Sequence, residues 1–167
     1  NLRWRDHTFL FLGAGSASQG IVQMIQRYCI YNEIELPKIL MCDSKGLMTT
    51  DRVDLDDRKR RFSCELPSTL RLSLGATPLE IVKAVKPTGI FGVSGQPNLI
   101  TNEMVESMDT STPIVMPLSN PIRNSECLYE DISSNPGLIF ASGSPMASLT
   151  LQNQANNMHV FPAIGRY

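Results

Sequence analysis

The chain has 167 residues, of which 42% are hydrophobic and 19% charged, and its formal net charge is −1. This length suits one domain with a sizeable core, and the composition excludes an intrinsically disordered chain. The near-neutral charge argues against a nucleic-acid partner, and no apolar run approaches the roughly 20 residues that a membrane span needs. The four cysteines form no Cys-x-x-Cys pair and no ligand spacing with histidine, so we expect reduced thiols.

The first part of the chain alternates apolar runs with an amphipathic segment. Residues 9–12 (Phe-Leu-Phe-Leu) form a short apolar run that ends at a glycine, which predicts a buried strand. Residues 17–31 carry apolar side chains every three or four positions, as a helix packed on one face does. Pro37 then breaks the chain, and residues 39–42 predict a second buried strand.

The rest of the chain repeats this alternation. Thr77, Pro78 and Glu80 are placed as the cap, first-turn proline and capping-box partner of a helix that ends near Val85. Further strands are predicted at residues 89–93, 113–118 and 138–141, and short helices at residues 102–108 (capped by Thr101) and 125–132. Apolar strands alternating with helices are typical of a parallel sheet covered on both faces. Residues 1–167 are therefore predicted to form one α/β domain, a Rossmann-type doubly wound parallel sheet with helices on both faces.

A glycine-rich turn leaves the first predicted strand and opens the first predicted helix. Gly13 permits the tight turn, and Gly15 lets the backbone approach a pyrophosphate without an intervening side chain. The helix N-terminus offers unpaired N–H groups and partial positive charge to the phosphates. Ser18 stands where this fingerprint has Gly or Ala, so its hydroxyl must be accommodated between helix and strand. The predicted pyrophosphate loop comprises Gly13, Ala14, Gly15, Ser16 and Ala17.

An acidic residue ends the second predicted strand. Asp43 occupies the place where dinucleotide-binding folds accept hydrogen bonds from the adenosine ribose, and its alternative role is to form a turn. A charged run follows at residues 51–61, most of whose members we expect to be solvated. One or two of its cations are close enough in sequence to reach a 2′-phosphate near Asp43.

Five segments resemble malic enzymes, and together they span almost the whole chain. They are residues 42–47 (Cys-Asp-Ser-Lys-Gly-Leu), 86–94 (Lys-Pro-Thr-Gly-Ile-Phe-Gly-Val-Ser), 117–121 (Pro-Leu-Ser-Asn-Pro), 140–145 (Phe-Ala-Ser-Gly-Ser-Pro) and 156–162 (Asn-Asn-Met-His-Val-Phe-Pro). Each segment is short, but all five occur in the order found in the family and at nearly the same spacing, which makes the match specific. The chain resembles the C-terminal NAD(P)-binding domain of that family.

This resemblance implies an oxidoreductase that converts malate to pyruvate and CO₂ while it reduces NAD or NADP, with Mg²⁺ or Mn²⁺ bound. It implies that residues 13–17 hold the pyrophosphate and Asp43 the ribose, with Ser44, Lys45, Lys59 and Ser94 also at the cofactor. Asn120 is implied to contact the nicotinamide ribose and the substrate, and Asn157 the substrate carboxylate, because an amide donates to carboxylates and accepts from hydroxyls. A homo-oligomer of the full-length protein, in the cytoplasm or the mitochondrial matrix, is also implied.

Family residues that turnover requires are absent from the sequence. The resemblance places the general acid and base, a tyrosine and a lysine, in a separate upstream domain with the metal-binding carboxylates, and none of those motifs occurs here. We therefore expect no catalytic residue and no metal ligand in this chain, which should bind cofactor without turning over malate. Residues 153–157 and 161–163 differ from the family's Gly-Gln-Gly-Asn-Asn and Phe-Pro-Gly, which bears on Asn157 rather than on the cofactor residues.

Cofactor choice depends on one carboxylate and the cations near it. Asp43 alone favours NAD, because a carboxylate accepts from a free 2′-hydroxyl and repels a 2′-phosphate. In the family, a lysine three residues before the phenylalanine matched by Phe62 accompanies NADP use, and Lys59 fills that place. Ser44 and Lys45, which follow the aspartate, also favour NADP. We therefore predict NADP as the cofactor, with NAD as the alternative.

Two other functions remain compatible with these residues. A complete small reductase needs a catalytic side chain near the nicotinamide, and without a Tyr-x-x-x-Lys pair the candidate is His159. A non-catalytic regulatory or scaffold Rossmann module is the other alternative, and Ser18 and the altered loop at residues 153–157 support it. Titration with NAD and NADP separates these functions, because selective binding excludes a nucleotide-free scaffold.

Overall fold

The computed structural model describes residues 3–67, 70, 72–147 and 153–155. Within them the strands are β1 (Thr8–Leu12), β2 (Lys38–Asp43), β3 (Gly46–Leu47), β4 (Gly89–Gly92), β5 (Ile114–Pro117) and β6 (Ile139–Phe140). The helices are α1 (Ser16–Tyr31), α2 (Asp57–Arg60), α3 (Pro78–Val85), α4 (Asn102–Glu106) and α5 (Tyr129–Ile132), with 3₁₀ turns η1 (Trp4–Asp6) and η2 (Ile122–Asn124). None of these described helices has the length and apolar character of a membrane-crossing helix.

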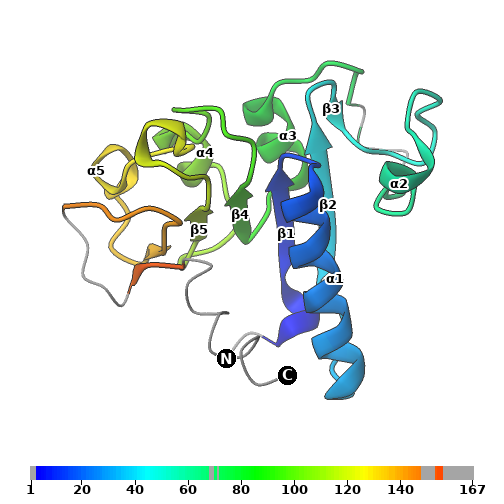
Figure 1. Cartoon of the computed structure of the whole chain (residues 1–167), viewed down its shortest axis with the longest axis horizontal. Coiled ribbons are helices and arrows are strands. Elements are labelled where there is room, and N and C mark those ends of the chain that lie inside the picture. The colour runs from blue at the N-terminus through cyan, green and yellow to red at the C-terminus, as the bar shows by residue number, and fades with distance from the viewer. Residues whose placement is uncertain (1–2, 68–69, 71, 148–152, 156–167) are drawn as a thin grey trace.

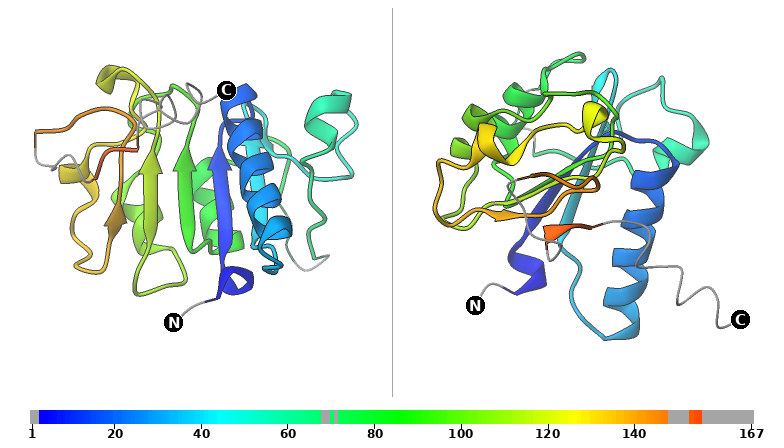
Figure 2. Two further views of the ribbon diagram at one scale, coloured as in Figure 1. Left: turned by 60° about the horizontal axis from the view of Figure 1, so that its bottom comes forward. Right: turned by 60° about the vertical axis from the view of Figure 1, so that its left-hand side comes forward.

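The strands form one sheet in the order β3-β2-β1-β4-β5-β6. All neighbours are parallel except β3, which runs antiparallel to β2. The chain builds one half of the sheet outward from β1, returns to place β4 beside β1, and then builds the other half (Figures 1 and 2). Ligands of open parallel sheets bind at such a reversal, outside the carboxyl ends of the strands. The predicted doubly wound α/β fold is confirmed.

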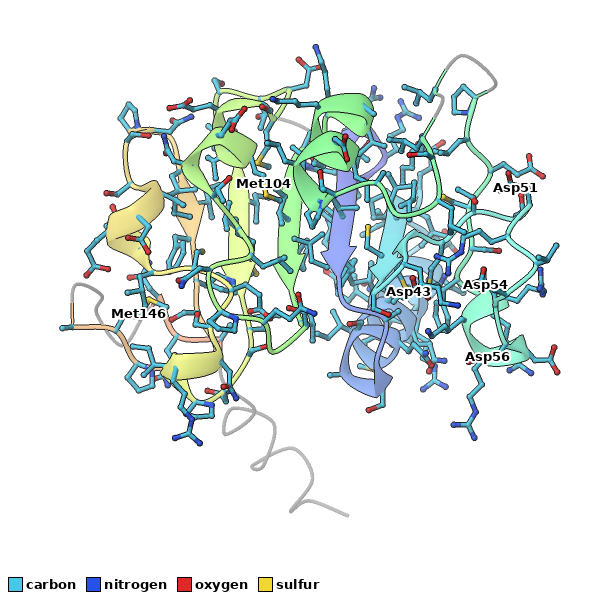
Figure 3. The ribbon with its side chains drawn as sticks, turned by 90° about the horizontal axis from the view of Figure 1, so that it is seen from above. Asp43, Asp51, Asp54, Asp56, Met104 and Met146 are labelled. Carbon is cyan, nitrogen blue, oxygen red and sulfur yellow. The ribbon has the colours of Figure 1, made fainter. Side chains whose placement is uncertain are left out.

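Each face of the sheet has its own apolar core, because successive side chains of a strand point to opposite faces. Leu10 of β1 packs with Ile81 of α3 and Met104 of α4 on one face. Its neighbour Phe11 packs with Val22 of α1 on the other face. Figure 3 shows Met104 on the side of the sheet away from α1. The predicted coverage of both faces by helices is confirmed, and it leaves the strand ends as the place for a ligand.

Capping residues set the starts of two helices, as the sequence predicts. The Thr77 hydroxyl accepts a hydrogen bond from the Glu80 N–H at 3.3 Å, and the Glu80 carboxylate accepts from the Thr77 N–H at 2.7 Å. This is the predicted capping box of α3. Thr101 caps α4 by accepting from the Met104 N–H at 3.3 Å. Both helices therefore begin where their local sequence specifies.

Two elements differ from the prediction. The predicted helix at residues 125–132 is wrong in its first half, since α5 begins only at Tyr129. The carbonyls of Ser125 and Glu126 instead accept from the N–H groups of residues 98 and 100. The sheet is also not parallel throughout, because Gly46, with a φ of +107°, lets the chain reverse after β2 and return as β3.

Candidate functional site

A cavity of about 570 Å³ opens at the carboxyl ends of β1, β2 and β4. Most of the predicted cofactor residues line it, namely Gly13, Ala14, Gly15, Asp43, Ser44, Lys45, Lys59 and Ser94. Ser16 and Ala17 lie beside it in the exposed first turn of α1. Asn120 lies apart from it, in a second hollow formed with Ser144 and Pro145. The fold thus brings three distant segments to the place where a doubly wound sheet binds its ligand.

The two glycines of the turn after β1 have different surroundings. Gly13 has a φ of +119°, and a Cβ there would lie 2.4 Å from the Val93 carbonyl oxygen, so the position requires glycine. Gly15 is the N-cap of α1, and a Cβ added to it would meet no atom within 4 Å. No side chain caps α1 and its first turn holds no acidic residue, so no side-chain charge of that turn compensates its partial positive charge. A helix N-terminus of this kind suits an anion such as a pyrophosphate.

We expect Gly13→Ala to lower the free energy of unfolding by about 2 kcal/mol or more, because backbone strain and the clash with Val93 add. Urea denaturation measures the loss. Gly75→Ala is the matched control: Gly75 also has a positive φ of +87°, but an added Cβ there meets no atom within 4 Å. Strain alone should cost that variant about 1 kcal/mol. Equal losses in the two variants would contradict a requirement for close contact at Gly13.

Ser18, three residues after Gly15, is fully buried in α1. Its hydroxyl has no hydrogen-bond partner among the described residues. The helix therefore accommodates serine in the place of Gly or Ala, at the energetic cost that an unsatisfied buried hydroxyl carries.

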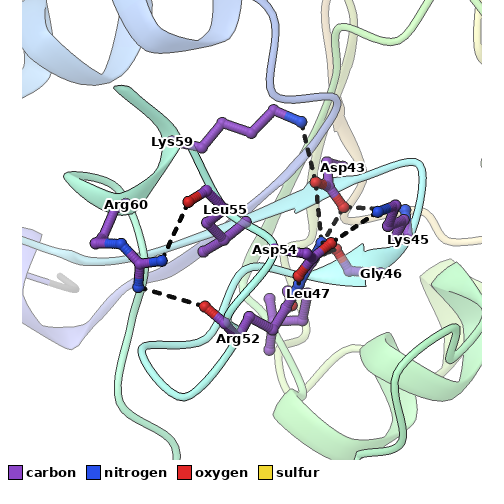
Figure 4. A network of polar contacts seen from close by, with 9 residues as sticks. All are labelled: Asp43, Lys45, Gly46, Leu47, Arg52, Asp54, Leu55, Lys59 and Arg60. Carbon is purple, nitrogen blue, oxygen red and sulfur yellow. Dashed lines mark hydrogen bonds and ion pairs between the residues drawn. The ribbon is translucent and has the colours of Figure 1, made fainter. Parts of the chain in front are cut away.

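Asp43 ends β2 with its carboxylate held by a buried arginine. Arg52 donates to both oxygens, at 2.9 Å to Oδ1 and 3.2 Å to Oδ2, and both side chains are 7% exposed. Arg52 also donates to Asp54 at 2.9 Å through Nε and 2.8 Å through Nη2, so one guanidinium bridges two carboxylates (Figure 4). A planar guanidinium suits this fork geometry. Arg52 is therefore an exception to the expectation that most members of the charged run are solvated, because its charge is paired and buried.

Two lysines complete this network (Figure 4). Lys59 Nζ donates to Asp43 Oδ2 at 3.1 Å, and Lys45 Nζ donates to Asp54 Oδ2 at 3.0 Å. The helix α2 positions Lys59, whose N–H donates to the capping carboxylate of Asp56 at 2.8 Å. Figure 3 shows Asp43, Asp54 and Asp56 on the side of the molecule that carries α2. Three cations and two carboxylates leave the network with a net charge of +1 beside the cavity.

The network also sets the ionisation of its carboxylates. Burial acts to raise the pKa of Asp43, but hydrogen bonds from Arg52, the Lys45 N–H and Lys59 outweigh it and hold that pKa below its ordinary value. Hydrogen bonds from Arg52 and Lys45 hold the pKa of Asp54 well below its usual range. Both carboxylates are therefore ionised at neutral pH and act there as hydrogen-bond acceptors rather than as general acids.

A carboxylate that the sequence analysis missed joins the ends of β4 and β5. Glu126 is fully buried, and its Oε1 accepts from the Ser94 N–H (2.7 Å), the Ser94 hydroxyl (3.1 Å), the Gly95 N–H (3.0 Å) and the Ser119 hydroxyl (2.6 Å). Gly92 makes room for it, because a Cβ there would lie 2.6 Å from Glu126 Cγ. The available signal was a lone charge in residues 124–129 (Asn-Ser-Glu-Cys-Leu-Tyr).

Asn120 follows β5 and is exposed. Its Oδ1 accepts a hydrogen bond from the Ser144 hydroxyl at 2.6 Å, which brings two of the segments of the resemblance together. Because Ser144 binds the amide oxygen, the amide NH₂ of Asn120 is the group left to donate to a ligand. Asn157 and His159 lie outside the described residues, as do the altered positions 161–163.

The comparison with known proteins agrees with this geometry. The family described as "Malic enzyme, NAD binding domain" matches residues 1–166. The chain is 39% identical to NADP-dependent malic enzyme 1 of Arabidopsis thaliana, over 96% of this chain and 29% of the relative. It is 36% identical to NAD-dependent malic enzyme 2, mitochondrial, of Arabidopsis thaliana, over 96% of this chain and 29% of the relative. It is 35% identical to the NAD-dependent malic enzyme of Acinetobacter baylyi, over 96% of this chain and 31% of the relative. The chain thus spans less than a third of the length of these relatives, and by sequence and fold it belongs to the family of malic enzyme NAD-binding domains.

Proposed function

We propose that this chain binds NADP or NAD in the cavity at the ends of β1, β2 and β4, and that it supplies the cofactor for oxidative decarboxylation of malate to pyruvate and CO₂ in the protein that contains it. The observation that carries the proposal is the cavity, which gathers the turn after β1, Asp43 with its cations, and Ser94. Membership of the malic enzyme NAD-binding domain family supports the reaction class.

Each part of the site suits one part of a dinucleotide. The N-terminus of α1, with Gly15, Ser16 and Ala17 on the turn formed by Gly13 and Ala14, suits the pyrophosphate. Asp43 and Ser44 lie where the adenosine ribose would bind, with Lys45 and Lys59 beside them. Ser94 and Asn120 follow the strands of the other half, which suits the nicotinamide ribose. The bound cofactor would accept the hydride of malate, and the part of this chain is to hold and orient it.

Other components of the reaction are proposed on the family resemblance. Asn120 and Asn157 are the substrate-binding candidates of this chain. The general acid, the general base and the carboxylates for Mg²⁺ or Mn²⁺ lie, in the family, upstream of the residues matched here. A homo-oligomer in the cytoplasm or the mitochondrial matrix completes the proposal.

The charges around Asp43 favour NADP over NAD. Arg52 and Lys59 already bind the Asp43 oxygens, so a 2′-phosphate would meet a compensated carboxylate instead of a bare one. Lys59 is 32% exposed and lines the cavity, so its ammonium group can turn from Asp43 to a phosphate while Arg52 remains in place. The net positive charge of the network adds to this preference.

Equilibrium titration of residues 1–167 with NADP and with NAD tests the proposal. We expect saturable binding at one site, with the lower dissociation constant for NADP. Competition by inorganic pyrophosphate would support the assignment of the turn after β1. If neither cofactor bound to folded protein, the function would instead be that of a scaffold module.

We also expect residues 1–167 to form no pyruvate from malate in the presence of Mn²⁺ and either cofactor. Hydride transfer and decarboxylation need a metal to polarise the substrate and a positioned acid and base, which the resemblance places outside this chain. Formation of the reduced cofactor, followed by absorbance, measures turnover, and an intact NADP-dependent malic enzyme serves as the positive control. Pyruvate formation above the level of a protein-free blank would show that the catalytic groups lie within these residues.

A further inference from the structure

Glu126 is a buried carboxylate whose hydrogen-bond partners are all neutral. It is 0% exposed, and the groups that donate to it belong to Ser94, Gly95 and Ser119. Within the described part of the chain, no ion pair includes it. Burial of a carboxylate without a cation costs more than burial of a neutral side chain of the same shape. A role for the charge itself would account for this cost.

The position of Glu126 relates it to one half of a dinucleotide. The pyrophosphate turn follows β1 and the ribose carboxylate Asp43 follows β2, so the nicotinamide half extends the opposite way, over β4 and β5. Glu126 joins the ends of those two strands, since Ser94 and Gly95 follow β4 and Ser119 follows β5. Ser94 lines the cavity, and Ser119 directly precedes Asn120.

We infer that Glu126 is a specificity-determining residue that makes the site favour the oxidised cofactor over the reduced one, an inference that rests on the proposed dinucleotide binding. The oxidised nicotinamide ring carries a positive charge and the reduced ring carries none, whereas the rest of the molecule is the same. A fixed negative charge behind the ends of β4 and β5 stabilises the first form and not the second. Because Glu126 is buried, water and salt screen its field little.

Two substitutions separate this electrostatic role from a merely structural one. Glu126→Gln keeps an oxygen that can accept from Ser94 and Ser119 but removes the charge. Glu126→Asp keeps the charge, but its side chain is one methylene group shorter. The carboxylate therefore lies farther from Ser94 and Ser119, and the hydrogen bonds from them are weaker. The electrostatic role therefore predicts the larger change of oxidised-to-reduced preference in the Gln variant. A structural role predicts the larger loss of affinity in the Asp variant, equally for both cofactor forms.

The test measures the dissociation constants of NADP⁺, NADPH and 2′-phospho-ADP-ribose, which lacks nicotinamide, in the full protein that contains this chain. We expect Glu126→Gln to weaken NADP⁺ relative to NADPH by a factor on the order of ten, and to leave 2′-phospho-ADP-ribose unchanged. Glu126→Asp should shift the ratio the same way by about two- to threefold. Ser119→Ala is the matched control, because it removes the 2.6 Å hydrogen bond to Glu126 and the 2.9 Å hydrogen bond from the Gly95 N–H but no charge, and its ratio should equal that of the wild type.

An unchanged ratio of NADP⁺ to NADPH affinity in folded Glu126→Gln overturns the inference, as does equal weakening of both. If circular dichroism shows that the Gln variant is unfolded, the Asp variant decides, and an unchanged ratio there overturns the inference. A wild-type protein that binds none of the three ligands contradicts the proposed function instead. If the wild type binds all three ligands and the variants leave the ratio of NADP⁺ to NADPH affinity unchanged, only the role of Glu126 is contradicted and the proposed function stands.

Discussion

A Gly15→Val variant is expected to fold normally and to bind NADP and NAD roughly a hundredfold more weakly than the wild type, or worse. The side chain would enter the open space in front of α1, where a Cβ meets no atom within 4 Å. It would therefore leave the protein's own packing intact and block the approach of phosphate to the N–H groups of the first helical turn. Calorimetric titration measures the affinity, and urea denaturation confirms that the variant is folded.

Gly20→Val is the matched control for this result. Gly20 lies in the same helix, is exposed and also has open space where its Cβ would be, but it does not line the cavity. Its cofactor affinity should equal that of the wild type. Undiminished affinity in folded Gly15→Val would show that the pyrophosphate does not bind in front of α1.

A Lys59→Gln variant is expected to lose about tenfold in affinity for NADP and little in affinity for NAD. A lysine that binds a 2′-phosphate makes a charge-assisted hydrogen bond, and partial exposure of Lys59 places its contribution at the lower end of the usual range. Asp43 keeps Arg52 as its partner in this variant, so the ribose side of the site stays in place. The ratio of the two dissociation constants, measured at low and moderate salt, is the result to compare.

Arg58→Gln is the control for the removal of one positive charge from the same helix. Arg58 is exposed and does not line the cavity, so the change should leave the ratio of NADP to NAD affinity unaltered. If Lys59→Gln and Arg58→Gln shift the ratio equally, the preference comes from the general charge of α2 and not from a contact with Lys59.

Features with a short-range signal were predicted correctly from the sequence. The capping box of α3 involves residues three apart, and the turn after β1 carries two glycines two apart, of which Gly13 is required by the backbone, so both features have a local signal. The apolar run of β1 is long enough for a strand and too short for a helix, which indicated its type directly. Since each strand was apolar on both sides, a sheet covered on both faces followed.

Features that depend on contacts between distant residues were missed. The short strand β3 pairs only because Gly46 reverses the chain beside β2. Glu126 lies 31 or 32 positions from Ser94 and Gly95, and nothing in its own neighbourhood of the sequence shows that these groups will donate to it. The start of α5 was misplaced for the same reason, since residues 125 and 126 bond to the backbone after β4 instead of continuing a helix.

The sequence by itself determined the α/β class, the glycine turn at residues 13–15, and an acid at the end of β2. Tertiary structure alone decided which charges of the run at residues 51–61 take part in the site. Arg52 is buried against Asp43, Lys59 reaches the same carboxylate from α2, and Arg58 remains exposed, although all three are cations of one short segment. The reason is physical: a buried charge needs an opposite charge or several hydrogen bonds to compensate it, and the fold decides which groups of the chain meet it.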